Sequence, residues 1–138
     1  MNIDEIIELL DSENEKNVEN GIEMAKNIKC IDCFIMPICS KTGSNARLWE
    51  NCARAISKCS DQKLELYISR LIEWTEDINW PGAYTIYKRL LHFENKKLLI
   101  EKIKHRINFL KNPNESLMYI EWLSSFEKEV EKTIINKE

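Results

Sequence analysis

Two cysteines three positions apart are the first residues whose spacing could do chemistry. Cys30 and Cys33 form a CxxC pair (CIDC), which occurs as half of a zinc site or as a redox dithiol. A structural zinc site needs two further ligands at a recognisable spacing, and redox pairs usually lie in a βαβ segment. The sequence shows neither pattern around this pair. We therefore expect no metal and no cofactor, and we interpret Cys30 and Cys33 as thiols of the hydrophobic core.

The remaining groups with catalytic potential are isolated in the sequence. His92 and His105 lie thirteen positions apart, with no HExxH motif, serine nucleophile or cysteine arrangement beside them. Residues 41–44 (KTGS) are too short and in the wrong order for a phosphate-binding loop, so we predict a turn there. The sequence therefore favours a protein that is not an enzyme.

The densest group of functional side chains is the segment 73–83, EWTEDINWPGA, which we call the tryptophan corner. It places three carboxylates beside two large aromatic side chains. Such a cluster is typical of a hot spot for a basic partner, because charge pairing beside a desolvated aromatic gives orientation and affinity. General acid–base catalysis would need a second catalytic group, and none is evident. The predicted partner-binding residues are Glu73, Glu76 and Asp77.

The same segment carries the signals of a helix boundary. One helix is expected to end near Trp74, and Pro81 suits the first turn of the next helix, where its missing N–H is not needed. Asn79 is expected to cap that helix. The alternative interpretation of the corner is therefore structural, with both indoles filling the gap between helical hairpins. The residues of this predicted structural motif are Trp74, Asn79, Trp80 and Pro81.

Acidic residues gather at the beginning of a chain whose net charge is -3. Residues 4–23 carry eight carboxylates and one lysine. This run could meet a basic protein or pack beside basic helices, although a solvated face is the commoner reason for such a run. The second set of predicted partner-binding residues is Glu8, Asp11, Glu15 and Glu19.

Basic residues gather later, where residues 88–111 carry eight Lys or Arg against two Glu. A nucleic-acid interface is one interpretation, because Tyr84, Tyr87 and Phe93 could stack bases. These aromatics fall at core spacing, however, and the sequence pI is about 5.6, so nucleic acid is a less favoured partner. The residues that such an interface would use are Lys96, Lys97, Lys102, Lys104 and Arg106.

The chain as a whole has a helical pattern. It has only three Gly and three Pro, and apolar residues recur three or four positions apart. A shift of 35 residues aligns Trp49 with Tyr84 and Ile56 with Leu91, which is the self-similarity of stacked hairpins. We predict an all-α, HEAT-like array of antiparallel helical hairpins, with about seven or eight helices in a single domain. Its predicted parts are an acidic N-terminal hairpin (1–28), a helical-hairpin array (44–124) and a charged C-terminal tail (125–138).

Local signals predict how individual helices begin and which residues they bury. Ser12 and Glu15 form a capping-box pair for the second helix, and Ser60 opens one helix that continues to the corner. Tyr84 and Phe109 fall on faces predicted to be buried.

The sequence predicts a cytoplasmic protein that does not contact a membrane. The N-terminus MNIDEIIELL carries acids where a signal peptide carries lysines, and no apolar run approaches the roughly 20 residues of a membrane span. Five cysteines, an odd number without an export signal, favour free thiols over a disulfide framework.

Residues 44–93 resemble a family of short bacterial helical proteins of unknown function. The resemblance lies in LWENCARAIS, SDQKLELYISRLIEWTEDINWPGA and RLLHF. The hallmark of that family is an E-W-x-x-D-hydrophobic-N-W-P-small-A corner between HEAT-like helices. This sequence matches the hallmark at Glu73, Trp74, Asp77, Asn79, Trp80, Pro81 and Ala83.

This resemblance implies a role in protein binding. Similar small helical proteins look like immunity proteins, which are encoded beside polymorphic or contact-dependent toxins and bind and block a cognate toxin domain. The family offers no catalytic residues to carry over. We therefore expect an immunity protein that occludes a cognate toxin, for which a basic nuclease domain is a fitting class. A general interaction scaffold or regulatory subunit is the alternative, followed by a nucleic-acid binder, and no oligomeric state is predicted.

Overall fold

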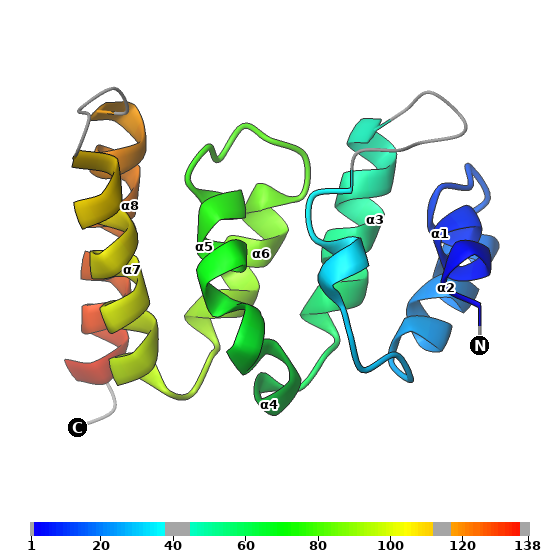
Figure 1. The fold of residues 1–138 in the computed structure, drawn as a ribbon, viewed down its shortest axis with the longest axis horizontal. Coiled ribbons are helices and arrows are strands. Elements are labelled where there is room, and N and C mark those ends of the chain that lie inside the picture. The colour runs from blue at the N-terminus through cyan, green and yellow to red at the C-terminus, as the bar shows by residue number, and fades with distance from the viewer. Residues whose placement is uncertain (1, 38–44, 112–116, 136–138) are drawn as a thin grey trace.

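The computed structural model describes residues 2–37, 45–111 and 117–135, and within them the chain is all-α, as predicted. Helices run up and down in succession along a single array (Figure 1). The elements are α1 (Ile3–Leu10), α2 (Glu15–Ala25), the 3-10 helix η1 (Asp32–Phe34), α3 (Asn45–Ser57), α4 (Asp61–Leu64), the 3-10 helix η2 (Glu65–Tyr67), α5 (Ile68–Thr75), α6 (Ala83–Leu91), α7 (Lys96–Lys111) and α8 (Leu117–Ile135).

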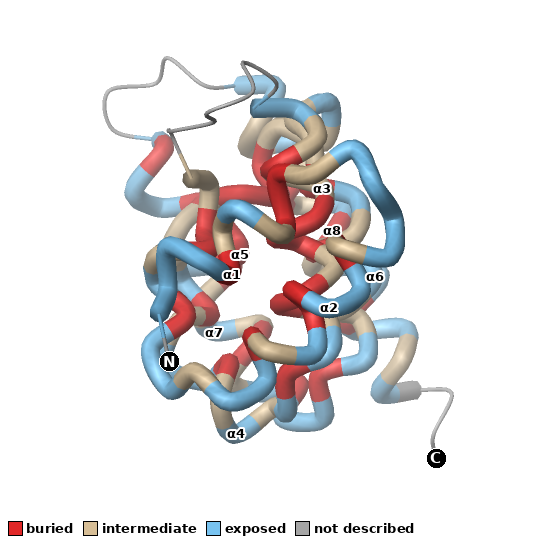
Figure 2. Tube along the Cα trace, turned by 90° about the vertical axis from the view of Figure 1, so that its right-hand side faces the viewer, coloured by how far each residue is buried: buried red, intermediate tan, exposed pale blue. Residues whose placement is uncertain are grey.

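The helices form the two layers expected of a HEAT-like array. In one layer α2 packs against α3, α3 against α6, and α6 against α8. In the other layer α5 packs against α7, and α1 lies on the same side, as the view along the array shows (Figure 2). Each hairpin thereby buries its apolar stripe against its neighbours, which is how a stacked helical repeat acquires a continuous core.

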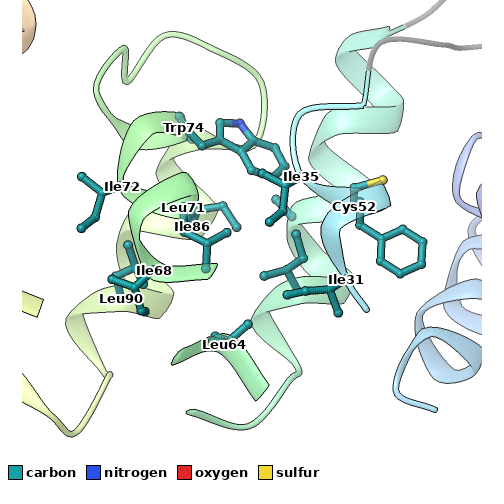
Figure 3. Packing of buried hydrophobic residues seen from close by; sticks show 14 of the residues in the cluster. Ile31, Ile35, Cys52, Leu64, Ile68, Leu71, Ile72, Trp74, Ile86 and Leu90 are labelled. Carbon is teal, nitrogen blue, oxygen red and sulfur yellow. The ribbon is translucent and has the colours of Figure 1, made fainter. Parts of the chain in front are cut away.

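The core lies between the two layers and follows the predicted helical spacing. Leu64, Ile68, Leu71 and Ile72 are fully buried, in agreement with the helical spacing of the apolar residues. Figure 3 shows Leu71 beside Ile86 of α6, on the side of α5 that faces Ile35, whereas Ile72 projects from the other side of α5. Fully burying such a side chain stabilises the fold by about 1.5 to 3 kcal/mol.

Trp74 is the largest fully buried side chain and joins three parts of the array. Its indole Nε1 donates a hydrogen bond to the carbonyl oxygen of Pro81 (2.9 Å), which closes the tryptophan corner on itself. Its ring packs edge-on against Trp49 of α3, with centroids 5.7 Å apart. Trp49 in turn packs edge-on against Trp80 at 6.2 Å, and Trp80 packs against Tyr119 of α8 at 6.2 Å. The corner therefore bridges α3, α5 and α8, which supports the structural interpretation of its tryptophans.

The prediction that Asn79 caps the helix after the corner is wrong. Helix α6 begins at Ala83, and its N-cap is Gly82, which makes no side-chain cap hydrogen bond. Gly82 has a φ of +80°, and a Cβ built there would lie 2.8 Å from Trp74 Cζ2 and 2.9 Å from the Trp49 carbonyl oxygen. Only glycine satisfies both the left-handed conformation and this close approach. Asn79 is exposed, and its backbone N–H donates to Asp77 Oδ1 (3.0 Å).

A polar cluster ties the opposite edge of the array together. Arg89 of α6 donates from Nε to the Ser57 carbonyl (3.2 Å) and from Nη2 to the Cys59 carbonyl (2.8 Å), which satisfies the end of α3. Its Nη2 also contacts Asp61 Oδ1 at 2.6 Å, while Asp61 Oδ2 accepts the Glu94 backbone N–H at 2.9 Å. The α3–α4 and α6–α7 connections are thereby held together by one Arg and one Asp.

Several local predictions need correction. The N-cap of α2 is Asn14, whose Oδ1 accepts from Lys16 and Asn17, and Ser12 instead accepts the Asn14 N–H. Ser60 does cap α4, but the predicted single helix to the corner is interrupted by η2. These differences arise because a side chain that could cap a helix can equally stabilise the turn that precedes it.

Burial also differs from the pattern at a few positions. Tyr84 and Phe109 are exposed, contrary to the prediction, and each ring lies beside a cation of its own helix, Lys88 and Arg106 respectively. Cys52 and Cys59 are buried thiols, whereas Cys30 is exposed and Cys33 only half-buried. The core-thiol interpretation is therefore wrong for Cys30.

The predicted charged tail at 125–138 is part of the array as far as Ile135. Helix α8 passes through residues 124 and 125 without a break, and it buries Phe126 and Val130. The ring of Phe126 packs edge-on against Tyr87 of α6, with centroids 4.9 Å apart. The turn predicted at 41–44 lies outside the described residues.

Changing Gly82 to Ala should lower the free energy of unfolding by about 2 to 4 kcal/mol, because the new Cβ enters the Trp74 ring and the left-handed conformation is strained. Urea unfolding followed by tryptophan fluorescence measures this change. Asn79→Ala in the same corner is the control and should stay within about 0.5 kcal/mol. A larger cost for Asn79→Ala than for Gly82→Ala would contradict the cap assignment.

The Asp61 carboxylate should make folding stability depend on acid pH. Its burial alone would raise its pKa, but the Glu94 N–H and the Arg89 guanidinium outweigh burial and lower the pKa below its ordinary value of 3.8. The stabilisation is therefore fully present above about pH 4 and is lost as the pH falls through the folded-state pKa. Asp61→Asn should cost about 1 to 2 kcal/mol at neutral pH, and the difference from the wild type should shrink in acid.

Urea unfolding at a series of pH values compares the two proteins. Glu65→Gln, an exposed carboxylate four residues later, is the matched control and should track the wild type at every pH. A difference between Asp61→Asn and wild type that is independent of pH would show that the carboxylate charge does not carry the interaction.

Candidate partner-binding site

The predicted partner-binding residue Glu76 faces inward. Only 5% of it is exposed, and its two carboxylate oxygens accept hydrogen bonds from Arg106 of α7, at 2.8 Å from Nε and 2.9 Å from Nη2. This bidentate geometry is the strong form of an Arg–carboxylate pair, and it raises the pKa of Arg106. The pair fixes the end of α5 to α7, so a partner could reach Glu76 only by displacing Arg106.

The other two carboxylates of the corner are half-buried. Asp77 uses Oδ1 to hold the corner backbone at Asn79, and its Oδ2 accepts the Tyr119 hydroxyl at 3.3 Å. Partial burial and this carboxylate raise the pKa of Tyr119. Glu73 lies one turn earlier, at the edge of α5. The corner thus brings its three predicted residues to one edge but commits two of them to contacts within the fold.

The basic residues of the nucleic-acid alternative do not form one open face. Lys96 is buried, and its Nζ donates to the Leu91 carbonyl. Arg106 is paired with Glu76, and Lys104 contacts Glu127 of α8 at 3.6 Å. Lys97 is exposed and Lys102 half-buried. A phosphate backbone needs several cations directed outward together, so this arrangement gives the nucleic-acid interpretation little support.

The N-terminal hairpin α1–α2 carries an open groove of about 630 Å³, which we call the N-terminal groove. Its lining has an acidic part (Glu5, Glu8 and Asp11), a neutral polar part (Ser12 and Asn17) and an apolar part (Leu9 and Met24). Glu5 and Glu8 are exposed, and Asp11 is buried. Two of the predicted acids, Glu8 and Asp11, therefore lie at one concave surface.

The sequence explains why this hairpin is compact enough to form a groove. Asn2 caps α1 by accepting the Asp4 N–H, and Asn14 caps α2, so both helices begin at a fixed residue. A Cβ at Gly21 would lie 3.0 Å from Leu9 Cβ and 3.1 Å from Leu10 Cδ2. The absence of a side chain at Gly21 thus lets α1 and α2 approach closely.

Helix α3 attaches the hairpin to the rest of the array. Asn51 Nδ2 donates to the Leu10 carbonyl at 2.8 Å, and Arg47 Nε donates to the Asp11 carbonyl at 3.2 Å, so two side chains satisfy the end of α1. Arg54 Nη2 contacts Glu15 Oε1 at 2.5 Å. This hydrogen bond to Arg54 lowers the pKa of Glu15. Among the predicted acids, Glu15 is therefore paired with Arg54 of α3 and not with the basic residues 88–111 beside which the alternative interpretation placed the acidic helices.

Glu19 is the remaining predicted acid and lies exposed on α2. The wider acidic surface of the hairpin also includes residues that the prediction did not single out. Glu5 is the most relevant of these, because its side chain lines the N-terminal groove. A helical-wheel comparison could have found it, since Glu5 and Glu8 are three apart and lie on the same face of α1.

The described residues hold no group that could bind a metal ion, and burial disfavours the thiolate form of three described cysteines. No three His, Cys, Asp or Glu side chains gather as a metal site would require within residues 2–37, 45–111 and 117–135. Burial raises the pKa of Cys33, Cys52 and Cys59, which keeps these thiols protonated. His92 Nδ1 contacts the Lys88 carbonyl at 2.9 Å on the outside of α6, and His105 is exposed on α7.

Comparison with known proteins places most of this array in one family. The family model described as a domain of unknown function (DUF5071) matches residues 50–136. That segment contains the tryptophan corner and helices α4 to α8, whereas the α1–α2 hairpin lies before it. Neither the curated proteins nor the solved structures include a match. None of the described helices combines the length and the apolar character that crossing a membrane requires.

Changing Glu76 to Ala should lower the free energy of unfolding by about 2 to 3 kcal/mol, because Arg106 then stays half-buried without its carboxylate. This is less than the roughly 3 to 5 kcal/mol of a fully buried pair, since Arg106 keeps some contact with water. Glu73→Ala, one turn earlier and half-exposed, is the control and should cost under about 0.5 kcal/mol. Urea unfolding followed by circular dichroism compares the two variants. An equal loss in free energy of unfolding would contradict the structural role of Glu76.

Proposed function

We propose that this chain, which belongs to the DUF5071 family of domains of unknown function, is an immunity protein that binds a cognate bacterial toxin and occludes its active face. The observation that carries the proposal is the N-terminal groove, where an apolar floor lies beside exposed acids at one end of a helical array. The resemblance of the tryptophan corner to short bacterial helical proteins similar to immunity proteins supports the same function.

The charge of the hairpin suits a basic partner. Residues 4–23 contain eight carboxylates and only one lysine. Of these acids, Glu5, Glu8 and Glu19 are exposed on α1 and α2. Such a surface attracts a basic protein before contact and accelerates its association, most strongly at low salt. The active face of a nuclease toxin is basic because it must bind phosphates, so it is the toxin class that fits best.

The rigidity of the array favours occlusion as the mechanism. The hairpin is fixed to α3 by hydrogen bonds from Arg47 and Asn51, and α3 is fixed to α6 by packing and by the Thr85 hydroxyl, which donates to Glu50 Oε1 at 2.6 Å. A partner bound at the hairpin would therefore meet a prearranged surface and lose little free energy in ordering it. The bulk of the array beside the groove would then keep a macromolecular substrate away.

Co-expression tests the proposal directly. The chain is produced together with the C-terminal toxic domain of a secreted protein encoded beside it, and cell survival and copurification are measured. Rescue of growth together with a stable complex is the expected result. Survival without this chain, or rescue without any complex, would contradict neutralisation by binding.

Exposed hairpin acids should speed the capture of the toxin. The variant Glu8→Gln with Glu19→Gln should reduce the association rate constant about fivefold or more at low salt, with little effect at high salt. The control variant, Glu121→Gln with Glu131→Gln, removes the same charge from exposed positions of α8 and should change the rate less than about twofold. Surface plasmon resonance gives both rates, and an equal effect of the two variants would assign the attraction to net charge alone.

A further inference from the structure

We infer that the N-terminal groove is an anchor pocket for an arginine side chain that projects from a basic segment of the partner protein. The inference rests on the proposed function and adds to it the chemistry of the occupant. It depends on three properties of the groove, which are its apolar floor, its set of hydrogen-bond acceptors and its size.

The apolar floor suits the stem of a long cationic side chain. Leu9 and Met24 are half-buried and face the groove from α1 and α2 respectively. Arginine and lysine bury their methylene stems on apolar surface while their charged heads stay near water or carboxylates. Methionine adapts its shape to such a stem, because its side chain is unbranched and flexible.

The polar lining consists mainly of acceptors. Glu5, Glu8 and Asp11 bring three carboxyl groups to the groove, and no Lys or Arg is among the described residues that line it. Asn17 donates from Nδ2 to Ser12 Oγ at 3.2 Å, which directs its N–H group along the hairpin and leaves its carbonyl oxygen as a further acceptor. A ligand that matches this lining must be a donor with positive charge.

The number and spread of these acceptors favour arginine over lysine. A guanidinium carries five N–H donors in a planar fork, and it is more weakly hydrated than an ammonium group, so it loses less on leaving water. It can contact carboxylates on successive turns of α1, where Glu5 and Glu8 are three residues apart. Arginine is also among the residues enriched at the centres of protein interfaces.

The size of the groove indicates that the arginine arrives as part of a larger segment. A volume of about 630 Å³ exceeds that of one side chain and is typical of a pocket that holds several residues. The groove is open to solvent on the α1–α2 hairpin, so a loop or helix of another protein can approach it.

Short peptides test the chemistry of the occupant without a known toxin. The probes are an acetylated, amidated peptide of alternating alanine and arginine, its lysine analogue, and its citrulline analogue, which keeps the shape of arginine but lacks the charge. Binding to the full chain is followed by two-dimensional NMR at low ionic strength. The expected result is that the arginine peptide shifts amide signals of α1 and α2 and binds at least about threefold tighter than the lysine peptide, while the citrulline peptide does not bind.

Variants of the full chain locate the binding. Glu5→Gln with Glu8→Gln should weaken the arginine peptide about tenfold, whereas Glu121→Gln with Glu131→Gln on α8 should change its affinity less than about twofold. Both variants lose two exposed charges, so urea unfolding should give the same free energy of unfolding for the two. Equal weakening by both variants, shifts outside α1 and α2, or equal binding of the lysine peptide would overturn the arginine assignment.

Failure of this inference can be told from failure of the proposed function. If a toxin is neutralised normally by Glu5→Gln with Glu8→Gln, the groove is not the anchor, although the chain is still an immunity protein. If the peptides bind as expected and no toxin is neutralised, the groove recognises arginine but the immunity function is wrong.

Discussion

The burial of one indole, that of Trp74, organises this array. Trp74 lies at the end of α5, and its indole N–H donates a hydrogen bond to the carbonyl oxygen of Pro81. Its ring packs edge-on against Trp49 of α3. The chain must then turn past the ring in the small space between two hairpins, which is why Gly82 approaches both tryptophans so closely. Stacked helical repeats depend on contacts with their neighbours for stability, so a joint between α3, α5 and α6 holds the two halves of the array in register.

The same joint explains where the chain can offer charge to a partner. The carboxylates of the corner are close to the core, and two of them already accept hydrogen bonds within the fold, Glu76 from Arg106 and Asp77 from Tyr119. A buried ion pair is costly to break, so Glu76 is poorly suited to exchange its partner for another protein. In the α1–α2 hairpin, by contrast, Glu5 and Glu19 are exposed rather than held in a buried ion pair. The N-terminal groove lies between the helices of this hairpin.

The sequence predicts the fold far better than the candidate site, because the two depend on different distances along the chain. Helices follow from apolar residues three or four apart, a local signal, and Leu64, Ile68 and Leu71 are buried as that spacing requires. The pairing of Glu76 with Arg106 joins residues 30 positions apart, and no local pattern announces it. Asn79 shows a second limit of local patterns. Its side chain could cap a helix, but the helix begins after Gly82, where only glycine fits beside the two tryptophans.

The arrangement separates the part that keeps the fold from the part proposed to bind. The joint at Trp74 and the cluster of Asp61 and Arg89 both lie within the central hairpins, whereas the N-terminal groove belongs to the first hairpin and contacts the array through α3. Effects of substitutions at sites without shared partners add independently. The charge and shape of the groove can therefore change to suit a different partner without a cost at the joint, which is the property that a family of partner-specific binding proteins requires.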